Sequence, residues 1–375
     1  MKSKLTLGVV VQGNLDLARD ILLGIRSYCN ANRNVHLELL SASGFVPKLA
    51  SLEVSLDALI AFESLPESIE VLHKLTPNVV LTSNRFAMEA PKVINDDFEI
   101  GRMGARYLLS KGYPSLAFLH AEGCLFSKER RQGFLEITEK SDIETRVLDL
   151  NNLTKVPDAL KILETLPSPV GILGCSDLHA RWLIESLEDP TKDIPSRFAI
   201  LGVDNDTLEQ ALCPVPLSSI ALAGRQIGYA AAETATQWAR GSRPPDEPVR
   251  IRPRGIITRH STDMLAYTDP IVKKALTLIS EKTEQFRDVG DVVRVLGIPR
   301  RTLEYRFNKV TGNSLGTLLT QARIRKASNL LAQTDLSIKE IAYLVGLSEP
   351  RMLSLIFKRE THETPSEYRE RTKLV

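Results

Sequence analysis

One short pattern occurs twice near the C-terminal end of the chain. DVGDVVRVLGIPRRTLEYRF begins at Asp288, and SIKEIAYLVGLSEPRMLSLIF begins at Ser337. Each copy opens on a side chain that can cap a helix, has an acid three positions later, and reaches a glycine at Gly297 or Gly346. A capping oxygen accepts from the first free N–H groups of a helix, and glycine permits a tight left-handed turn. The pattern predicts two helix-turn-helix units, at about 288–310 and 337–359.

The second helix of each predicted unit has an apolar pair at i, i+4, which is Leu303 with Phe307 and Leu353 with Phe357. The run GTLLTQARIRKASNLLAQT between the copies contains no helix breaker over its central part, so a helix of about 22 Å can hold the two units apart. Successive major-groove faces of B-DNA lie about 34 Å apart. Residues 268–375 hold 19 Lys and Arg against 13 Asp and Glu. We therefore predict double-stranded DNA as a partner of this part.

The first part of the chain has a different architecture. Up to about residue 262, short β-branched runs such as LTLGVVV and FAILGVD alternate with amphipathic segments, which predicts α/β structure with parallel sheets flanked by helices. The composition changes near STDMLAYTDP. We expect a first domain over 1–262, a linker over 263–268 and an all-α domain over 269–375, its first helix opening at Asp269-Pro270.

Several classes of function are not expected. No GxGxxG or Walker A sequence follows a predicted strand, so no nucleotide cofactor is predicted. The four cysteines and six histidines are scattered, which favours neither a metal site nor disulfides. No nucleophile elbow or paired acid and base indicates an enzyme. The N-terminal apolar run is too short for a signal peptide or a membrane span, so we expect a cytoplasmic protein with no membrane partner.

The C-terminal motifs resemble a known family. IPRRTLEYRF, RIRKASNLL, SIKEIAYLVGLS and FKRETHETPSEYR follow in the order typical of the AraC-type DNA-binding domain. The resemblance covers about 100 residues and implies that the second helix of each unit enters the major groove. Tyr305 and Leu355 stand where that family often carries arginine.

The N-terminal region resembles a second family. VINDDFEIGRMGARYLLSKGY, SKERRQGF, GILGCSDLHA and FAILGVDND are similar to LacI/GalR regulators and periplasmic binding proteins. The combined order resembles the xylose-operon activators of the AraC family over nearly the whole chain. The resemblance implies a two-lobed, periplasmic-binding-protein-like domain that binds a sugar and dimerises. Its implied function is sugar-controlled transcription regulation, with xylose or another pentose as the effector and with activation of sugar catabolism genes as the outcome.

The resemblance and the strand ends together select candidate effector-binding residues. Arg130 matches an arginine that clamps sugar hydroxyls in the second family, and Asp204 follows an apolar strand where a carboxylate can accept from a sugar. Asp204 could instead cap the helix DTLEQAL, a role that Asn205 or Asp206 could also fill. Ser176 replaces an asparagine common in that family. Further candidates follow the first and fifth strands: Gln12, Asn14, Asp96 and Asp97.

The predicted DNA contacts fall into two groups. If the apolar pairs face inward, the outward side chains that can reach bases are Arg300, Arg301, Glu304, Tyr305, Arg351, Ser354 and Leu355. Basic side chains elsewhere are expected at phosphates, which fix register without carrying sequence information: Lys309, Arg323, Arg325, Lys326, Lys358 and Arg359.

Two hypotheses for the first domain stay open at this point. The first is a sugar sensor whose closure changes how a homodimer presents its DNA-binding domains, with RNA polymerase as a partner if the protein activates. The second, motivated by Ser176, is a dimerisation scaffold or a sensor of a non-sugar ligand.

Overall fold

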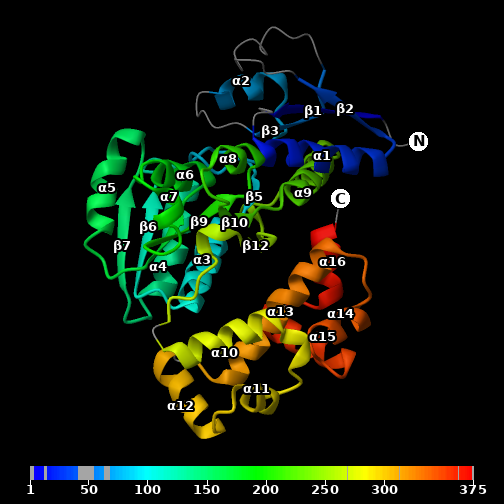
Figure 1. Cartoon of the computed structure of the whole chain (residues 1–375). Helices are drawn as coiled ribbons and strands as arrows, with labels where there is room; N and C mark the ends of the chain where they lie inside the picture. The colour runs from blue at the N-terminus through cyan, green and yellow to red at the C-terminus, as the bar shows by residue number, and fades with distance from the viewer. Residues whose placement is uncertain are drawn as a thin grey trace. The chain divides into compact units, whose positions relative to one another are not determined.

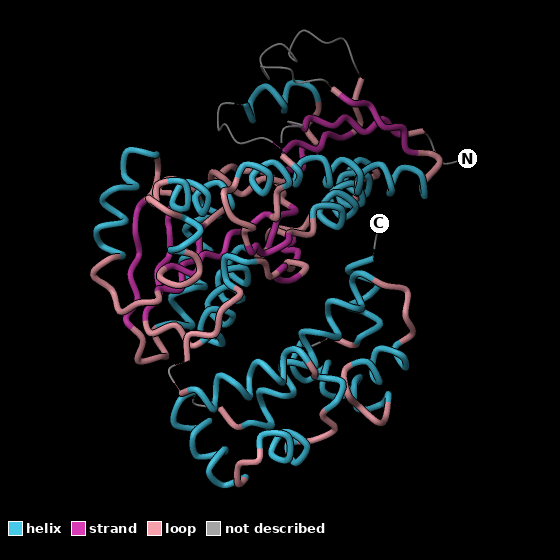
Figure 2. The backbone as a smooth tube through the Cα atoms, viewed as in Figure 1, coloured by secondary structure: helices cyan, strands magenta, loops and turns pink. Residues whose placement is uncertain are grey.

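The structure of the chain is a computed structural model that describes residues 4–11, 15–40, 55–62, 68–267, 269–311, 313–361 and 363–373. It forms two compact units. The first comprises the residues up to Leu108 together with Pro114–Asp263, and the second comprises Leu109–Tyr113 together with Met264–Leu374. Figure 2 shows that the described strands all precede residue 269 and that the described part after it consists of helices joined by loops.

The first unit contains two main sheets (Figure 1). The first has the order β2-β1-β3-β4 and is parallel, with Leu7 beside Leu37 and Val9 beside Ile60. The second has the order β12-β10-β9-β8-β6-β7, in which only β12 is antiparallel to its neighbour. A short parallel pair, β5 with β11, adjoins the first sheet through a bridge between Leu81 and Lys92. This is the two-lobed, periplasmic-binding-protein-like arrangement that the sequence predicts.

The strands of this unit are β1 Leu5–Val11, β2 Val35–Leu39, β3 Ala58–Phe62, β4 Val79–Leu81, β5 Val93–Asn95, β6 Ser115–His120, β7 Glu144–Asp149, β8 Val170–Gly174, β9 Phe198–Asp204, β10 Ser218–Ala221, β11 Val249–Ile251 and β12 Gly255–Ile257. Its helices are α1 Asp16–Ala31, α2 Ser68–Leu75, α3 Asp97–Lys111, α4 Leu125–Thr138, α5 Val156–Leu163, α6 Asp177–Glu185, α7 Pro190–Asp193, α8 Thr207–Leu212 and α9 Gly224–Ala239. Helix α3 ends in the second unit.

Glycines let helix pairs in the first unit cross closely. On α1 and α9, a Cβ at Gly24 would lie 1.9 Å from the Arg225 carbonyl oxygen, and one at Gly228 would lie 1.9 Å from that of Ile21. Such distances exclude any side chain, so the two backbones are in direct contact. This crossing lies over the first sheet, where Ile21, Ile25 and Ile227 join the core formed by β1 and β3.

The second unit consists of α10 Pro270–Glu281, α11 Val289–Leu296, α12 Arg300–Thr311, α13 Leu315–Gln333, α14 Ile338–Leu344, α15 Pro350–Thr361 and α16 Pro365–Lys373, with a 3₁₀ turn at Thr283–Gln285. Helix α10 opens as predicted, because the Asp269 carboxylate accepts from the N–H groups of Ile271 and Val272. The linker packs on the end of α3, where the Tyr267 hydroxyl donates to the Ser110 carbonyl.

Two helix-turn-helix units are present, as predicted: α11 with α12, and α14 with α15. Asp288 accepts from the Asp291 N–H, and Ser337 with Glu340 forms a complete capping box. Gly297 and Gly346 adopt the left-handed conformation, with φ of 68° and 78°. Each unit has its own apolar core, and α13 contributes Leu315, Leu318 and Leu319 to the first and Ile324, Ala327 and Leu331 to the second.

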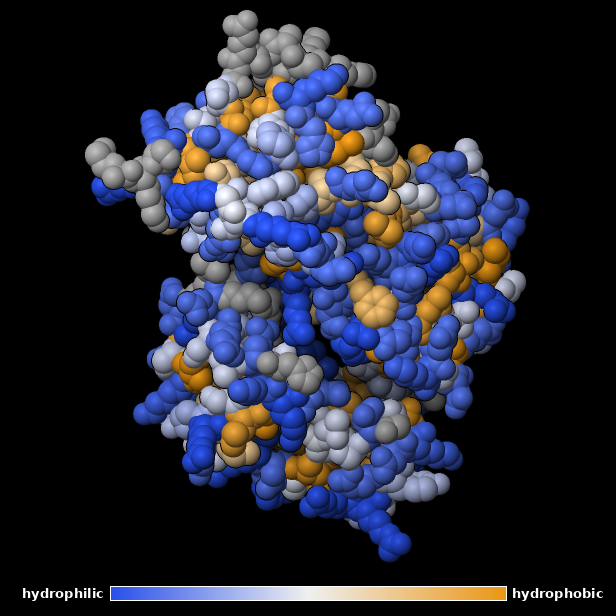
Figure 3. All heavy atoms as spheres, turned by 180° about the vertical axis from the view of Figure 1, so that it is seen from behind, coloured by the Kyte–Doolittle hydropathy of each residue, from blue (hydrophilic) through white to orange (hydrophobic). Residues whose placement is uncertain are grey.

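Figure 3 shows a mostly hydrophilic face with apolar residues in small separate groups. Within the ranges given above, no helix has the length and apolar character needed to cross a membrane.

Candidate effector site and nucleic-acid interface

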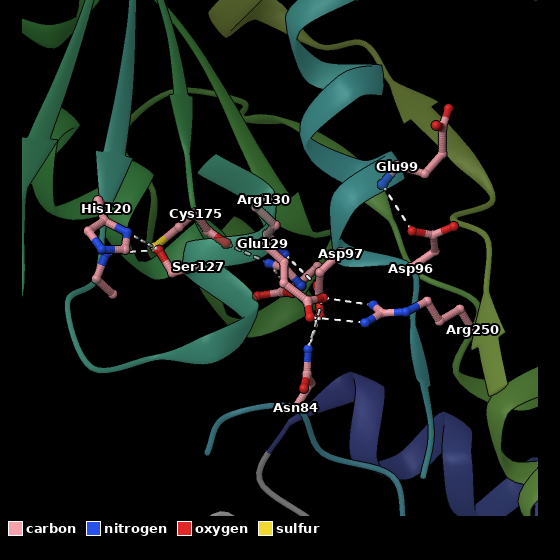
Figure 4. A network of polar contacts seen from close by, with 12 residues as sticks. Asn84, Asp96, Asp97, Glu99, His120, Ser127, Glu129, Arg130, Cys175 and Arg250 are labelled. Atoms are coloured by element: carbon pink, nitrogen blue, oxygen red, sulfur yellow. Dashed lines mark hydrogen bonds and ion pairs between the residues drawn. The ribbon is translucent and has the colours of Figure 1, made fainter. Parts of the chain in front are cut away.

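A close crossing of α3 and α4 positions Arg130. A Cβ at Gly101 would lie 1.9 Å from the Arg130 carbonyl oxygen, and one at Gly133 would lie 2.0 Å from that of Phe98. With the helices so close, Arg130 Nε donates to Asp97 Oδ1 at 2.8 Å (Figure 4). Both residues are buried, with exposed fractions of 4% and 1%. Since a buried carboxylate and guanidinium must be paired, Asp97 holds Arg130 in one orientation.

The Arg130 guanidinium lies at the carboxyl ends of two neighbouring strands. Its Nη1 donates to the carbonyl of Cys175, directly after β8, and lies 3.8 Å from Asp204 Oδ1 at the end of β9. Its carbon stands 4.9 Å from the centre of the Phe126 ring. We call Arg130, Ser176 and Asp204 the strand-end site. This is where parallel α/β sheets bind small molecules.

Asp204 has an unusual backbone and an unusual carboxyl group. Its φ is 116°, and that of Asn205 is 52°. Residues other than glycine rarely adopt a positive φ, and those that do are concentrated at functional sites. Burial raises the pKa of the Asp204 carboxyl to about 7, although Arg130 opposes this rise. The carboxyl keeps access to solvent, since 30% of the side chain is exposed. Asp206 caps α8 by accepting from the N–H groups of Leu208 and Glu209, so Asp204 is not the cap.

The other predicted effector residues have different surroundings. Ser176 precedes α6, and its hydroxyl pairs with His179 Nδ1 at 2.7 Å. Asp97 accepts from Arg130 through one oxygen and from Asn84 at 3.0 Å through the other, so both oxygens are engaged within the protein and position the arginine. Asp96 was expected at the site but caps α3, accepting from the Glu99 N–H at 3.0 Å. Gln12 and Asn14 lie outside the described residues.

Polar residues that the sequence analysis did not single out support the site (Figure 4). Asn84 follows β4 and also donates to Glu129 Oε2 at 3.2 Å, while Arg250 binds both oxygens of Glu129, at 2.7 and 3.0 Å. His179 packs near Arg130, and burial lowers the pKa of its imidazole to about 4, so it is neutral at physiological pH. Of these residues, only Asn84 could have been selected from the sequence, because it lies just after a predicted strand.

Two sets of hydrogen bonds join segments that follow strands of different sheets. Asp16 at the start of α1 donates its N–H to Asp206 Oδ2 at 3.0 Å, and its own carboxylate accepts from the Thr207 N–H at the start of α8. At the start of α4, the N–H groups of Leu125 and Phe126 donate to the carbonyls of Arg85 and Asn84, at 2.8 and 2.9 Å. These bonds join the two lobes. In the parts of the chain that the structure describes, no group of His, Cys, Asp and Glu could hold a metal.

The two recognition helices, α12 and α15, present equivalent outward faces. Leu303 with Phe307 and Leu353 with Phe357 are fully buried. On the opposite face Tyr305 is 66% exposed and Leu355 is 56% exposed. Arg300, Arg301 and Arg351 are also exposed, whereas Glu304 and Ser354 are half-buried. Among the basic residues expected at phosphates, Lys309, Arg325, Lys358 and Arg359 are exposed and Lys326 is half-buried beside Glu284.

Arg323 departs from its predicted role. It was expected at phosphate, but its side chain is buried, with 8% exposed. Its Nε donates to the Val345 carbonyl, and its Nη2 donates to those of Phe286, Arg287 and Gly346. Because these donors are engaged inside the protein, Arg323 is removed from the phosphate-contacting set. Spacing on α13 alone did not distinguish it from Arg325 and Lys326.

A two-lobed α/β unit with a ligand-type strand-end site, joined to two helix-turn-helix units, defines a transcription regulator that combines effector recognition and DNA binding in one chain. Comparisons with family models agree: residues 105–262 match a periplasmic binding protein-like domain, and residues 292–371 match a helix-turn-helix domain. The chain is 30% identical over 331 residues to the xylose operon regulatory protein of Haemophilus influenzae, covering 84% of this chain and 86% of that one. The chain belongs to the family of xylose operon regulatory proteins.

Further relatives extend the likeness. The xylose operon regulatory protein of Escherichia coli K12 is 28% identical over 289 residues, which cover 74% of this chain and 73% of the relative. The solved structure of a xylose-binding transcription activator, XylR, matches over 98% of both chains with a TM-score of 0.60 at 23% identity. That match shows a common fold over the whole length.

Proposed function

We propose that the strand-end site binds a monosaccharide, with D-xylose or another pentose as its effector. The observation that carries the proposal is the Arg130 guanidinium, fixed by Asp97 and set 3.8 Å from the Asp204 carboxylate. A fork of N–H donors beside a double acceptor suits adjacent hydroxyl groups, which both donate and accept. The relatives are named for regulation of xylose operons.

We further propose that α12 and α15 read DNA bases. Arg300, Arg301 and Glu304 on the first helix, with Arg351 and Ser354 on the second, supply donors and acceptors for base edges. Tyr305 and Leu355 occupy matching exposed positions, where an apolar surface suits the methyl group of thymine. Contacts to phosphate are assigned to Lys309, Arg325, Lys326, Lys358 and Arg359, without Arg323.

The proposed organisation follows from these two roles. Residues 1–262 bind the effector and carry a homodimer contact, residues 263–268 link, and residues 269–375 bind DNA. RNA polymerase is a partner if the protein activates its target genes. No enzymatic step is assigned, and the protein acts in the cytoplasm, where operators are found.

Calorimetric titration of the full-length protein tests the effector assignment. D-xylose, L-arabinose, D-ribose and D-glucose are titrated separately, and D-xylose is expected to bind most tightly. Asp204→Asn, which keeps the size of the side chain, should weaken the binding by about 1 to 3 kcal/mol, because a charged acceptor is lost. Asp158→Asn, on the surface helix α5, is the matched control and should bind as the wild type does.

If no sugar gives measurable heat at millimolar concentration, although the protein still unfolds cooperatively, the sugar assignment is wrong. The first domain would then be a dimerisation scaffold or the sensor of a non-sugar ligand.

A further inference from the structure

Arg323 donates hydrogen bonds to four backbone carbonyl groups of the second unit. It lies on α13, the helix shared by both helix-turn-helix cores. Its Nη2 donates to the carbonyl oxygens of Phe286, Arg287 and Gly346 at 2.7, 2.8 and 3.1 Å, and its Nε donates to that of Val345 at 3.2 Å. A planar guanidinium can address acceptors on several sides at once, which an ammonium on a flexible stem cannot.

The four carbonyls belong to different helix-turn-helix units. Phe286 and Arg287 immediately precede Asp288, the residue that caps the first helix of the first unit. Val345 and Gly346 form the turn between α14 and α15 of the second unit. Carbonyls at a helix end have no partner within the helix. The single side chain of Arg323 thus donates hydrogen bonds to carbonyl groups in the turn of the second unit and in the segment that leads into the first unit.

Gly346 brings these two segments into direct contact. A Cβ at this position would lie 2.6 Å from the Thr283 carbonyl oxygen and 2.8 Å from that of Phe286. The glycine therefore serves two purposes, a left-handed turn and a close approach of the two backbones. The corresponding Gly297 of the first unit has nothing within 4 Å of a Cβ, so only its turn requires glycine.

We propose that Arg323, together with Gly346, is the positioning residue that fixes recognition helix α15 relative to α12. It thereby sets the separation of base-reading contacts that the protein accepts along DNA. This inference rests on the proposed reading of bases by both helices. It assigns Arg323 no contact with DNA.

The test uses full-length protein and a duplex selected from a randomised library by the wild type. Duplexes with one or two base pairs inserted between the two selected segments are then compared with the parent. Each insertion moves the segments apart by about 3.4 Å and about a tenth of a turn. For the wild type, the insertions should lower affinity by about a hundredfold, because a rigid pair of modules loses simultaneous engagement.

Arg323→Met and Arg323→Lys should bind the parent duplex more weakly and lose less than about tenfold on insertion, since a loosened α15 can follow the shifted segment. Thr320→Val, on the same helix, removes only a bond to the Gly316 carbonyl within that helix and should retain the wild-type penalty. Thermal unfolding of each variant establishes that it is folded, and Arg323→Lys provides the milder change should Arg323→Met not fold.

A uniform loss of affinity in which Arg323→Lys keeps the wild-type insertion penalty would overturn the inference, and so would unchanged binding. Selection by the wild type of a single segment would instead overturn the proposed reading by two helices. The two failures are therefore distinguishable.

Discussion

Asp204 combines a strained backbone with a carboxyl group whose charge depends on pH near neutrality. Because burial raises the pKa of this carboxyl to about 7, it is protonated at lower pH and ionised at higher pH. The ionised form accepts hydrogen bonds from sugar hydroxyls at both oxygens and more strongly than the protonated form, which turns one oxygen into a donor. Affinity for D-xylose should therefore fall about tenfold from pH 8 to pH 6, following the fraction ionised.

Calorimetry at these two pH values measures this effect. His179 stays neutral throughout, since its pKa is about 4. Asp204→Asn should bind weakly with no pH dependence. A pH dependence that persists in this variant would come from another group, such as Asp177, whose carboxyl pKa is also raised by burial. A wild-type affinity that is the same at pH 6 and pH 8 would show that Asp204 does not titrate in this range or does not contact the sugar.

Among the elements, the starts of α1 and α8 hold one another through an exchange of hydrogen bonds between Asp16, Asp206 and Thr207. These bonds form only when the lobes are close. Asp16→Ala should therefore weaken D-xylose binding by about tenfold while leaving Arg130 and Asp204 unchanged, because the closed form loses the bond from the Thr207 N–H to the Asp16 carboxylate, and a hydrogen bond to a charged group is worth about 1.5 kcal/mol or more. The bond from the Asp16 N–H to Asp206 remains. Titration calorimetry gives the affinity.

Asp20→Ala is the control for this variant. It lies on the same helix and pairs with Arg225 of α9, within the first lobe. Equal affinities for Asp16→Ala and Asp20→Ala would mean that the contact between α1 and α8 does not contribute to effector binding.

Substitutions on the recognition helices should have different effects at residues that contact bases and at residues that contact phosphates. Arg301→Ala and Arg351→Ala should each cost about 1 to 3 kcal/mol and relax sequence preference in one segment of the site, with the affected positions about ten base pairs apart. Lys358→Ala should weaken binding to all DNA sequences similarly, and it should lower the slope of log affinity against log salt concentration by about one. Selection from randomised duplexes distinguishes these cases. An unchanged preferred sequence for Arg351→Ala would reduce α15 to a backbone contact.

For the molecule as a whole, features fixed by local chemistry were predictable from the sequence. The caps at Asp288 and Ser337 and the turns at Gly297 and Gly346 depend on neighbours within a few positions. Strands with weak apolar signals were not. β7 is an exposed edge strand, and β10 has the sequence SSIA, in which Ser218 and Ser219 are buried through hydrogen bonds and not through apolar contact.

The residues of the candidate sites also differ in whether local sequence or long-range contacts decide their roles. Arg130 and Asp204 were predicted, and the fold brings them together. The roles of Asp96, Asp97 and Arg323 depend on partners between 3 and 37 positions away in the chain, and only folding decides which oxygens meet which donors. Arg323 shows this most clearly, because its neighbour Arg325 has the same residue type and an exposed side chain.

We infer that effector binding at the strand-end site changes the affinity of the same chain for DNA. This coupling is tested by measuring the dissociation constant of the full-length protein for its selected duplex, by fluorescence anisotropy, with and without saturating D-xylose. We expect a change of about fivefold or more, as for typical linked sites. At a D-xylose concentration just sufficient to saturate the wild type, Asp204→Asn should show a smaller change, because its weaker sugar binding leaves part of the protein without sugar. Identical DNA affinity with and without D-xylose, in protein shown by calorimetry to bind the sugar, would mean that the two sites are not coupled.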